Sequence, residues 1–292
     1  MSADKKINPG LGITEALRFM TALLAEKEIS QPDAEARVLL SAATHMSRAQ
    51  MITQSDRSIS KAEAEILSAW IARRLKGEPV TRITGRRDFW TLDLRVTPDV
   101  LDPRADTEVI VETALDLLGA RHTKAFRMLD LGTGTGALLL ALLSECPHAT
   151  GIGIDLSPAA CAVAQENAQR NGLATRSTFQ LGHWGDELSE TFDLVVSNPP
   201  YIESATIAAL DAEVREHDPM LALDGGPDGL SAYRAIIHDL PRLLSPAGLC
   251  VLELGIGQAE AVNALAEAAG LTQKALRRDL GGVERALALG WP

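Results

Sequence analysis

The sequence lacks a long apolar run, an apolar leader and a cysteine cluster. Its longest apolar stretch, residues 137–143, is far shorter than the roughly 20 residues that a membrane-spanning helix needs. Residues 1–12 contain no apolar segment typical of secretory signal peptides, so we expect a cytoplasmic protein with no membrane partner. The cysteines, at positions 146, 161 and 250, have no metal-ligand spacing, which predicts reduced thiols and no metal site.

The chain also lacks an excess of basic residues. It has 28 Lys and Arg against 39 Asp and Glu, a formal net charge of −11. The imbalance is uneven, because residues 1–86 sum to +3 and the remaining residues to −14. A strongly acidic half is unsuited to hold a phosphate backbone, so we expect no direct nucleic-acid binding. The acidity fits a basic protein partner, and it fits equally well a role in solubility alone.

The first third of the chain predicts helices followed by a hairpin. Residues 13–76 place apolar side chains at helical spacing, and Ser60 with Glu63 forms a capping box at the start of one helix. Residues 89–96 alternate apolar and polar side chains, as a strand or hairpin does. We therefore predict an N-terminal helical substrate-docking domain over residues 1–80, a β-hairpin linker over 81–103 and a catalytic domain over 104–292.

From residue 107 onward, helical and strand patterns alternate. This alternation predicts an α/β fold with a parallel, doubly wound sheet. The expected elements are helix 107–119, strand 126–131, helix 136–145, strand 150–155, helix 158–171, strand 192–197, helix 229–244 and strand 248–254. Residues 203–229 combine proline, glycine and acidic residues with weak periodicity, so we expect them to form a loop over the site.

A glycine-rich turn follows the predicted strand 126–131. Its glycines allow positive φ and a close approach of the backbone to a ligand, and the next helix offers free N–H groups. At the end of the following strand, a carboxylate can accept both hydroxyls of a ribose. The predicted nucleotide-binding residues are Gly132, Thr133, Gly134, Thr135, Gly136 and Asp155. The spacing Gly132-x-Gly134-x-x-Ala137 also fits an NAD-dependent oxidoreductase, which stays an alternative at this point.

Trp184 lies in Leu181-Gly182-His183-Trp184, at the mouth of the predicted sheet and before strand 192–197. At that position an adenine ring can stack on the indole. An isolated tryptophan fits a place in the hydrophobic core equally well. From the residues alone, Trp184 is therefore a candidate adenine contact with packing as the alternative.

The tetrapeptide Asn198-Pro199-Pro200-Tyr201 directly follows the predicted strand 192–197. Two prolines fix φ and remove two backbone donors, so a rigid turn must end this strand. Asn198 can offer its side-chain oxygen and Pro199 its carbonyl to an NH₂ group, while Tyr201 can lie against a flat group and attract a sulfonium. This clamp predicts methyl transfer from S-adenosylmethionine to a planar nitrogen. Hydride transfer has no use for such a clamp, which argues against an oxidoreductase.

These motifs belong to a wider resemblance that covers nearly the whole chain. The chain resembles the protein-(glutamine-N5) methyltransferases of the HemK/PrmC family, which modify class 1 peptide chain release factors. Besides the glycine-rich turn and Asn198–Tyr201, the likeness rests on Gly77-Glu78-Pro79, Gly85-Arg86-Arg87-Asp88-Phe89-Trp90, Val96-Thr97-Pro98-Asp99-Val100-Leu101, Pro103-Arg104-Ala105-Asp106-Thr107-Glu108, Leu221-Ala222-Leu223-Asp224-Gly225-Gly226 and Arg278-Asp279-Leu280-Gly281-Gly282-Val283-Glu284-Arg285.

The resemblance implies a class I S-adenosylmethionine-dependent methyltransferase with a Rossmann-like sheet. It implies that the Gly132–Gly136 turn holds the methionine part of S-adenosylmethionine, that Asp155 binds the ribose and that Trp184 lies by the adenine. Asn198–Tyr201 would hold the glutamine side chain of the release factor's Gly-Gly-Gln loop. The helical front domain would help to grip the release factor, which makes a class 1 release factor the expected partner.

Three residues depart from the family pattern. Ala105 replaces a common proline, and Asp102 stands where an aliphatic residue is usual; neither is a predicted chemical group. His183 stands where the family often has an acid before the aromatic residue. Adenine binding then falls to stacking on Trp184 and to a backbone acceptor.

Two other functions remain to be weighed. Asn-Pro-Pro-Tyr is shared with adenine-N6 DNA methyltransferases, which flip a base into the same clamp. That function predicts a basic groove or a recognition domain, and the acidic catalytic half argues against it. A ribosome-associated binding module that has lost activity is the third interpretation. The intact glycine-rich turn, Asp155 and Asn198 argue against such a loss.

Overall fold

The computed structural model describes residues 6–292, and the chain divides into two compact units that meet in sequence between Gly85 and Arg86. We expect no apolar leader in residues 1–12, and part of that segment lies outside the described residues. The division into parts 1–80, 81–103 and 104–292 assigns a role to each part and stays a prediction. Each unit has a hydrophobic core of its own and is described by itself.

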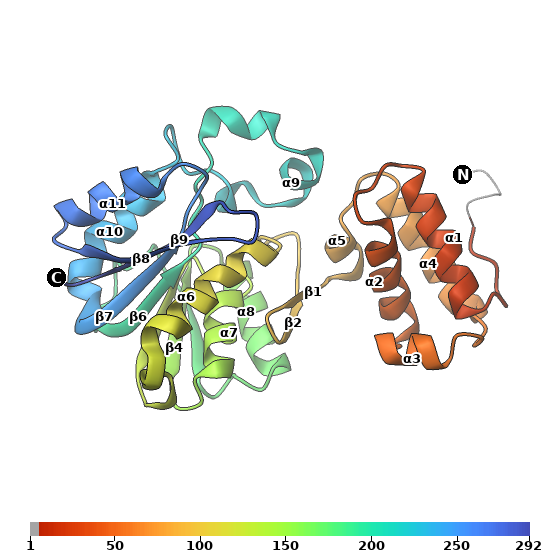
Figure 1. Ribbon diagram of the computed structural model, residues 1–292, viewed down its shortest axis with the longest axis horizontal. Helices are drawn as coiled ribbons and strands as arrows, with labels where there is room; N and C mark the ends of the chain where they lie inside the picture. Colours follow the sequence, from red (N-terminus) through yellow and green to blue (C-terminus); the bar gives the residue numbers. More distant parts are fainter. Residues whose placement is uncertain (1–5) are drawn as a thin grey trace. The chain divides into compact units, whose positions relative to one another are not determined.

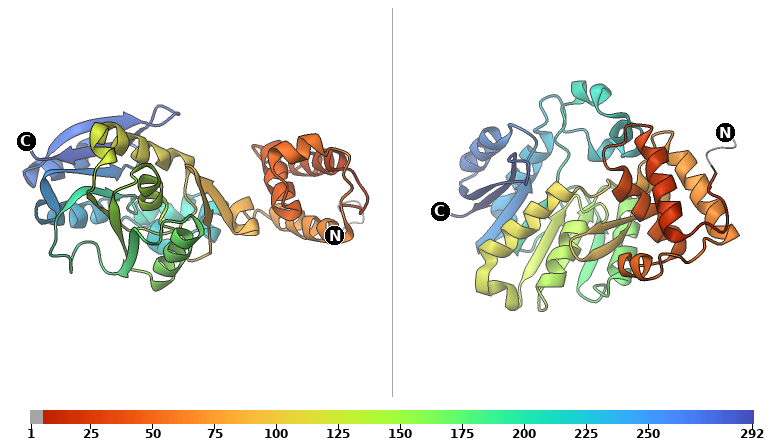
Figure 2. Two further views of the ribbon diagram at one scale, coloured as in Figure 1. Left: turned by 90° about the horizontal axis from the view of Figure 1, so that it is seen from below. Right: turned by 45° about the vertical axis from the view of Figure 1, so that its right-hand side comes forward.

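In the part of the chain that the structure describes, the first unit is a bundle of helices (Figure 1 and Figure 2). Its helices are α1 (Ile13–Ala25), α2 (Pro32–Thr44), α3 (Arg48–Thr53), α4 (Lys61–Arg74) and α5 (Val80–Thr84). At the start of α4 the Ser60 hydroxyl accepts the Glu63 N–H at 3.2 Å, and the Glu63 carboxylate accepts the Ser60 N–H at 2.8 Å. The predicted helices and capping box are therefore confirmed. Leu24, Leu40 and Leu67 are fully buried in the core of this bundle.

The second unit begins with a short antiparallel hairpin, β1 (Arg86–Phe89) and β2 (Leu92–Arg95). Asn167 of α8 (Pro158–Arg170) connects this hairpin to the glycine-rich turn. Its side-chain oxygen accepts the Arg95 N–H at 2.6 Å, and its NH₂ group donates to the Thr135 carbonyl at 2.9 Å. The hairpin predicted over residues 89–96 is confirmed, with a start three residues earlier, while its linking role stays a prediction.

A seven-stranded sheet forms the centre of the second unit, with the strand order β5-β4-β3-β6-β7-β9-β8. The strands are β3 (Arg127–Leu131), β4 (Thr150–Asp155), β5 (Ser177–Leu181), β6 (Phe192–Ser197), β7 (Leu244–Glu253), β8 (Thr272–Arg278) and β9 (Glu284–Gly290). The five strands from β5 to β7 are parallel, as predicted. The sheet as a whole is mixed, because β9, which lies outside the predicted strands, runs antiparallel to both β7 and β8.

Helices cover both faces of this sheet (Figure 1). On one face lie α6 (Glu108–Leu118), α7 (Ala137–Glu145) and α8, and on the other lie α10 (Ser231–Leu243) and α11 (Ala259–Ala268). Successive strand residues point to opposite faces, so Met128 joins the core beneath α6 and α7 while Leu129 joins the core beneath α10. The doubly wound arrangement is thus confirmed, and it leaves the carboxyl ends of the parallel strands open.

The segment between β6 and α10 has little regular structure. It contains the short helix α9 (Ala212–His217) and two 3₁₀ turns, η4 (Ser204–Ala209) and η5 (Met220–Ala222). Ile202 pairs with Asp224 in an isolated parallel bridge, which closes the segment on itself. The predicted loop over residues 203–229 therefore begins and ends beside the Asn198–Tyr201 turn.

Across residues 6–292, no helix is both long and apolar enough to cross a membrane. The described residues also hold no cluster of three or more side chains that could bind a metal ion. All three cysteines are free thiols, with Cys146 and Cys250 buried and Cys161 half-buried.

Candidate active site

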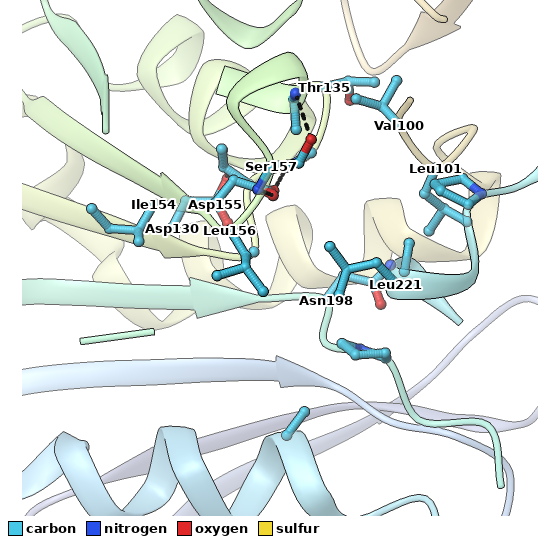
Figure 3. Close-up of a pocket in the computed structure, with 18 of the residues that line it drawn as sticks. Val100, Leu101, Asp130, Thr135, Ile154, Asp155, Leu156, Ser157, Asn198 and Leu221 are labelled. Atoms are coloured by element: carbon cyan, nitrogen blue, oxygen red, sulfur yellow. Dashed lines mark hydrogen bonds between the residues drawn. The ribbon is translucent and has the colours of Figure 1, made fainter. Parts of the chain in front are cut away.

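A cavity of about 680 Å³ opens in the second unit at the carboxyl ends of β3, β4 and β6. This is the edge of an open α/β sheet at which ligands bind, and the volume is ordinary for a small-molecule site. Figure 3 shows part of its lining. Asp155 and Ser157 lie near the end of one strand, and Asn198 and Leu221 lie on another part of the cavity wall. Most of the predicted site residues line it: Gly132, Thr133, Gly134, Thr135, Asp155, Trp184, Asn198 and Pro200.

The glycine-rich turn between β3 and α7 forms one wall of the cavity. Gly132 has a φ of +73°, a conformation that an L side chain rarely adopts, and the turn needs it to leave the strand sharply. The N–H groups of Gly132 and Thr133 both donate to the Ile154 carbonyl at 2.9 Å. These bonds fasten the turn to β4, so the loop is held in place by the neighbouring strand.

Asp155, at the end of β4, holds the next part of the same turn. One carboxylate oxygen accepts the Gly134 N–H at 2.8 Å, and the other accepts the Ser157 N–H at 2.9 Å. A carboxylate has about four acceptor positions, so both oxygens can still accept hydrogen bonds from a ligand in the cavity. Asp155 is therefore placed both to bind a hydroxyl group and to shape the glycine-rich turn.

Asp130 is a wall residue that the sequence analysis missed as a site residue. Its side chain is 1% exposed, and Oδ2 accepts the Thr133 hydroxyl at 2.6 Å. The other oxygen, Oδ1, is buried without a hydrogen-bond partner. Burial raises the pKa of this carboxyl group to about 7, against a smaller lowering by the Thr133 hydroxyl. An unsatisfied carboxylate oxygen in a cavity wall suits a cationic or hydrogen-bonding ligand group.

Trp184 lies against the glycine-rich turn. A Cβ atom built on Gly132 would be 3.4 Å from the Cζ3 atom of this indole, so the ring packs on the turn's backbone. Trp184 is half-buried, contacts the core under α10 and also lines the cavity. Its φ of +48° is unusual for a bulky residue, which indicates that the surroundings hold the ring in place. Packing and ligand contact, which the sequence left as alternatives, are thus compatible.

His183, the residue before this tryptophan, also lines the cavity. Its ring makes an edge contact with the indole at a centroid distance of 6.0 Å. The Nδ1 atom lies 3.1 Å from the carboxylate of Asp186. The imidazole is exposed, so it borders the cavity at a solvent-facing position.

Asn198 extends from the end of β6 into the cavity (Figure 3). Its side-chain NH₂ group donates to the Thr107 hydroxyl oxygen at 3.3 Å. Thr107 ends the 3₁₀ turn η2 (Ala105–Thr107), directly before α6, and it too lines the cavity. With the NH₂ group engaged by Thr107, the Asn198 carbonyl oxygen is left for a ligand, which is the orientation that an NH₂ clamp needs.

The rest of the tetrapeptide divides between the cavity and the interior. Pro200 lines the cavity, whereas Pro199 is buried and Tyr201 is not among the lining residues. The Tyr201 hydroxyl donates to Glu253 Oε1 at 3.2 Å, and burial together with that carboxylate raises the pKa of the phenol. Contacts of Pro199 and Tyr201 with a substrate stay predictions, and in this structure the tyrosine anchors the turn.

The backbone of the turn is supported by the residue that precedes α11 and by the segment that precedes α10. Gln258 donates to the Tyr201 carbonyl at 3.0 Å and to the Gly229 carbonyl at 3.3 Å. Gly229 has a φ of +70°, and a Cβ there would lie 2.5 Å from the Tyr201 carbonyl oxygen. Only glycine fits at this position without displacing the turn. The arrangement makes the clamp a preformed part of the fold.

The comparisons with known proteins identify the family. Residues 15–85 match the model of the PrmC N-terminal domain, and residues 122–276 match the model of a methyltransferase domain. The release factor glutamine methyltransferase of Rhodospirillum rubrum is 47% identical over 259 residues, covering 89% of this chain and 79% of that protein. This chain belongs to the release factor glutamine methyltransferase family. Its catalytic fold is accordingly that of the class I methyltransferases.

Two further likenesses agree with this membership. The release factor glutamine methyltransferase of Caulobacter vibrioides is 46% identical over 263 residues, or 90% of each chain. Among solved structures, a methyltransferase from Pyrococcus furiosus matches with a TM-score of 0.50 at 17% identity, covering 76% of this chain and 98% of that one. At that identity the structural match supports the fold alone.

Proposed function

We propose that this protein transfers a methyl group from S-adenosylmethionine to the side-chain nitrogen (N5) of the glutamine in the Gly-Gly-Gln loop of class 1 peptide chain release factors. The observation that carries this proposal is the orientation of Asn198, whose NH₂ group is held by Thr107 so that its oxygen is offered to the cavity. Membership of the release factor glutamine methyltransferase family supports the choice of substrate.

The cavity residues fit S-adenosylmethionine group by group. We assign the ribose hydroxyls to Asp155, the adenine to Trp184 and the methionine part to the turn from Gly132 to Gly136, of which all but Gly136 line the cavity. Asp130 provides the test of this fit, because its buried and unpartnered Oδ1 matches the positive ammonium group of the methionine part. Bound there, S-adenosylmethionine supplies a methyl group on a positively charged sulfur.

The clamp acts on the glutamine amide. In our proposal Asn198 Oδ1 accepts one N–H of the substrate and the Pro199 carbonyl accepts the other. The amide nitrogen would gain positive charge as its lone pair forms the new bond to the methyl carbon, while the carbon–sulfur bond breaks and its electron pair leaves with neutral S-adenosylhomocysteine. Both acceptors would stabilise the charge on nitrogen. Fixing the nitrogen in line with the methyl group contributes further, and such positioning can be worth roughly 7–11 kcal/mol. The extra proton on nitrogen then leaves to water.

The release factor itself is the proposed partner, and the protein is proposed to act in the cytoplasm. The residues after 86 sum to a charge of −14, which suits a basic protein surface and opposes a nucleic-acid phosphate backbone. We infer that the helical first unit contributes to holding the release factor, as the match to the PrmC N-terminal domain supports.

The test is a labelling experiment with three substrates. Purified protein and labelled S-adenosylmethionine are offered a class 1 release factor, its Gly-Gly-Gln→Gly-Gly-Ala variant and duplex DNA, and peptide mass spectrometry locates the methyl group. We expect label on that glutamine and on neither control. Label on DNA alone would refute the substrate and leave the clamp chemistry standing, whereas no label on any of them would refute the proposed function.

A further inference from the structure

Glu253 is a buried carboxylate to which the proposed chemistry assigns no role. It is the last residue of β7, and its side chain is 2% exposed. β7 pairs with β6 in parallel register, with Ser197 opposite Leu252. The next residues of the two strands are Asn198 and Glu253, so the carboxylate lies at the same sheet edge as the clamp.

The Glu253 carboxylate contacts two parts of the clamp. Oε1 accepts the Tyr201 hydroxyl at 3.2 Å. The Thr107 hydroxyl lies beside the same carboxylate and lowers the pKa of Glu253. Oε2 is buried and has no partner of ordinary hydrogen-bond geometry. Of the nearby charges, Arg285 attracts the carboxylate and Asp106 repels it.

Stability alone does not account for this residue. Burial is the largest influence on Glu253 and raises its pKa to about 7, above the usual value, despite the opposing effects of Thr107 and Arg285. The ionised form is therefore disfavoured by the fold, and a neutral side chain of similar size would cost less to bury. A group that the fold holds at such a cost is a candidate for a functional role.

The directions of the hydrogen bonds show what that role is. Above its raised pKa of about 7 the Glu253 side chain is ionised and only accepts, so a hydroxyl beside it points its hydrogen toward it. Thr107 then presents oxygen lone pairs to Asn198 and can only accept from the asparagine NH₂ group, as it does at 3.3 Å. The Asn198 oxygen is consequently the atom that faces the cavity.

We propose that Glu253 is a positioning residue for the methyl transfer, which sets the direction of the Thr107–Asn198 hydrogen bond and anchors the clamp through the Tyr201 hydroxyl. This inference rests on the proposed function. Glu253 does not line the cavity and takes no proton from the substrate amide in this proposal. Its effect is to decide whether Asn198 offers an acceptor or a donor to that amide.

The informative variant is Glu253→Gln, which keeps the size and removes the charge. Its NH₂ group can donate to the Thr107 oxygen, which frees the Thr107 hydrogen to donate to Asn198 and permits the asparagine amide to turn round. We expect kcat to fall by about tenfold or more, the factor that one net hydrogen bond is worth. The KM for the release factor and the dissociation constant of S-adenosylhomocysteine should stay within about twofold.

Thr107 gives a matched pair of variants. Thr107→Val keeps the shape and lacks the hydroxyl, so its kcat should fall as in Glu253→Gln, whereas Thr107→Ser keeps the hydroxyl and should retain kcat. The two residues act on Asn198 through the same series of contacts. The kcat of the double variant Thr107→Val/Glu253→Gln should therefore fall little below that of the worse single variant. Glu260→Gln, an exposed charge removal on α11, is the control and should change nothing.

A readout without the reaction separates this inference from the proposed function. The side-chain NH₂ resonance of Asn198 in a ¹⁵N NMR spectrum can be assigned by its loss in Asn198→Ala. We expect it to shift in Glu253→Gln and Thr107→Val and to stay in place in Thr107→Ser and Glu260→Gln. An unshifted resonance in Glu253→Gln, or an unchanged kcat, would overturn the positioning role. So would a lower melting temperature of Glu253→Gln at pH 8, which a purely structural role predicts.

Discussion

The sharpest test of the cofactor assignment is Asp155→Ala. The substitution removes a carboxylate that accepts the N–H groups of Gly134 and Ser157 and that we assign to the ribose hydroxyls. Hydrogen bonds to a charged group are worth about 1.5–3 kcal/mol, which corresponds to a roughly 10- to 150-fold rise in the dissociation constant. Isothermal titration calorimetry with S-adenosylhomocysteine measures this change directly. Asp116→Ala, which removes an exposed carboxylate of α6, is the matched control.

A loosened glycine-rich turn alone could also weaken binding, so the ligand is varied as well. The 2′-deoxy analogue of S-adenosylhomocysteine lacks one of the hydroxyls that Asp155 is assigned to bind. We expect the wild-type protein to prefer the ribose ligand and Asp155→Ala to lose that preference, because the two changes remove the same hydrogen bond. Equal preference in both proteins would show that the ribose lies elsewhere, even if the overall affinity falls.

The remaining predictions concern the clamp, the cavity wall and the strand beneath it. Asn198→Ala should lower kcat by about 100-fold or more with little change in S-adenosylhomocysteine affinity by calorimetry, since it removes an acceptor for charge that develops on nitrogen. The affinity for S-adenosylmethionine should rise between pH 6 and pH 8, because the pKa of Asp130 is raised to about 7 and only the ionised carboxylate pairs with an ammonium group. The variant Asp130→Asn should abolish that pH dependence in calorimetric titrations. Gly153→Ala should lower the free energy of unfolding by about 1–3 kcal/mol in urea titrations, because the new Cβ would lie 2.6 Å from Phe179 and 2.7 Å from the Thr133 hydroxyl oxygen.

The sequence was sufficient for the parts of the fold that rest on local patterns. The predicted strands 150–155 and 192–197 have the bounds of β4 and β6, because each is a short, largely buried segment that ends at a turn. The glycine-rich turn and the two prolines mark strand ends through backbone geometry, which neighbouring residues dictate. These strand ends also locate the cavity, since all parallel strands in one sheet end at one edge.

The missed strands have less distinctive sequences. β8 lies at the edge of the sheet and carries Lys274, Arg277 and Arg278, so it has no apolar run to reveal it. β9 is apolar, but a local pattern does not determine whether a strand runs parallel or antiparallel to its neighbour. β5 is short and largely exposed, and it was absent from the predicted elements for the same reason.

The roles of individual side chains were harder to predict than their positions. Tyr201 was expected to lie against the substrate, and its place in a turn could not reveal that its hydroxyl donates to Glu253, 52 residues further along the chain. Glu253 itself looks like an ordinary strand end between Leu252 and Leu254. Its relation to Asn198 arises only from the pairing of β6 with β7, which no local pattern encodes.

The reversed strand explains how the active-site edge holds so many carboxylates. Asp155 and Glu253 end parallel strands, and Asp130 is the residue before the end of β3. The three carboxylates therefore gather at one edge, where Asp130 and Glu253 are nearly fully buried. Because β9 runs the other way, its beginning lies at that edge and brings the buried Arg285 close to Glu253. The pKa of Asp130 is influenced instead by a hydroxyl, a backbone N–H and the Asp155 carboxylate. Glu253 thus has a cation supplied by the fold, while Asp130 is suited to receive one from a ligand, as its assignment to the ammonium group of S-adenosylmethionine requires.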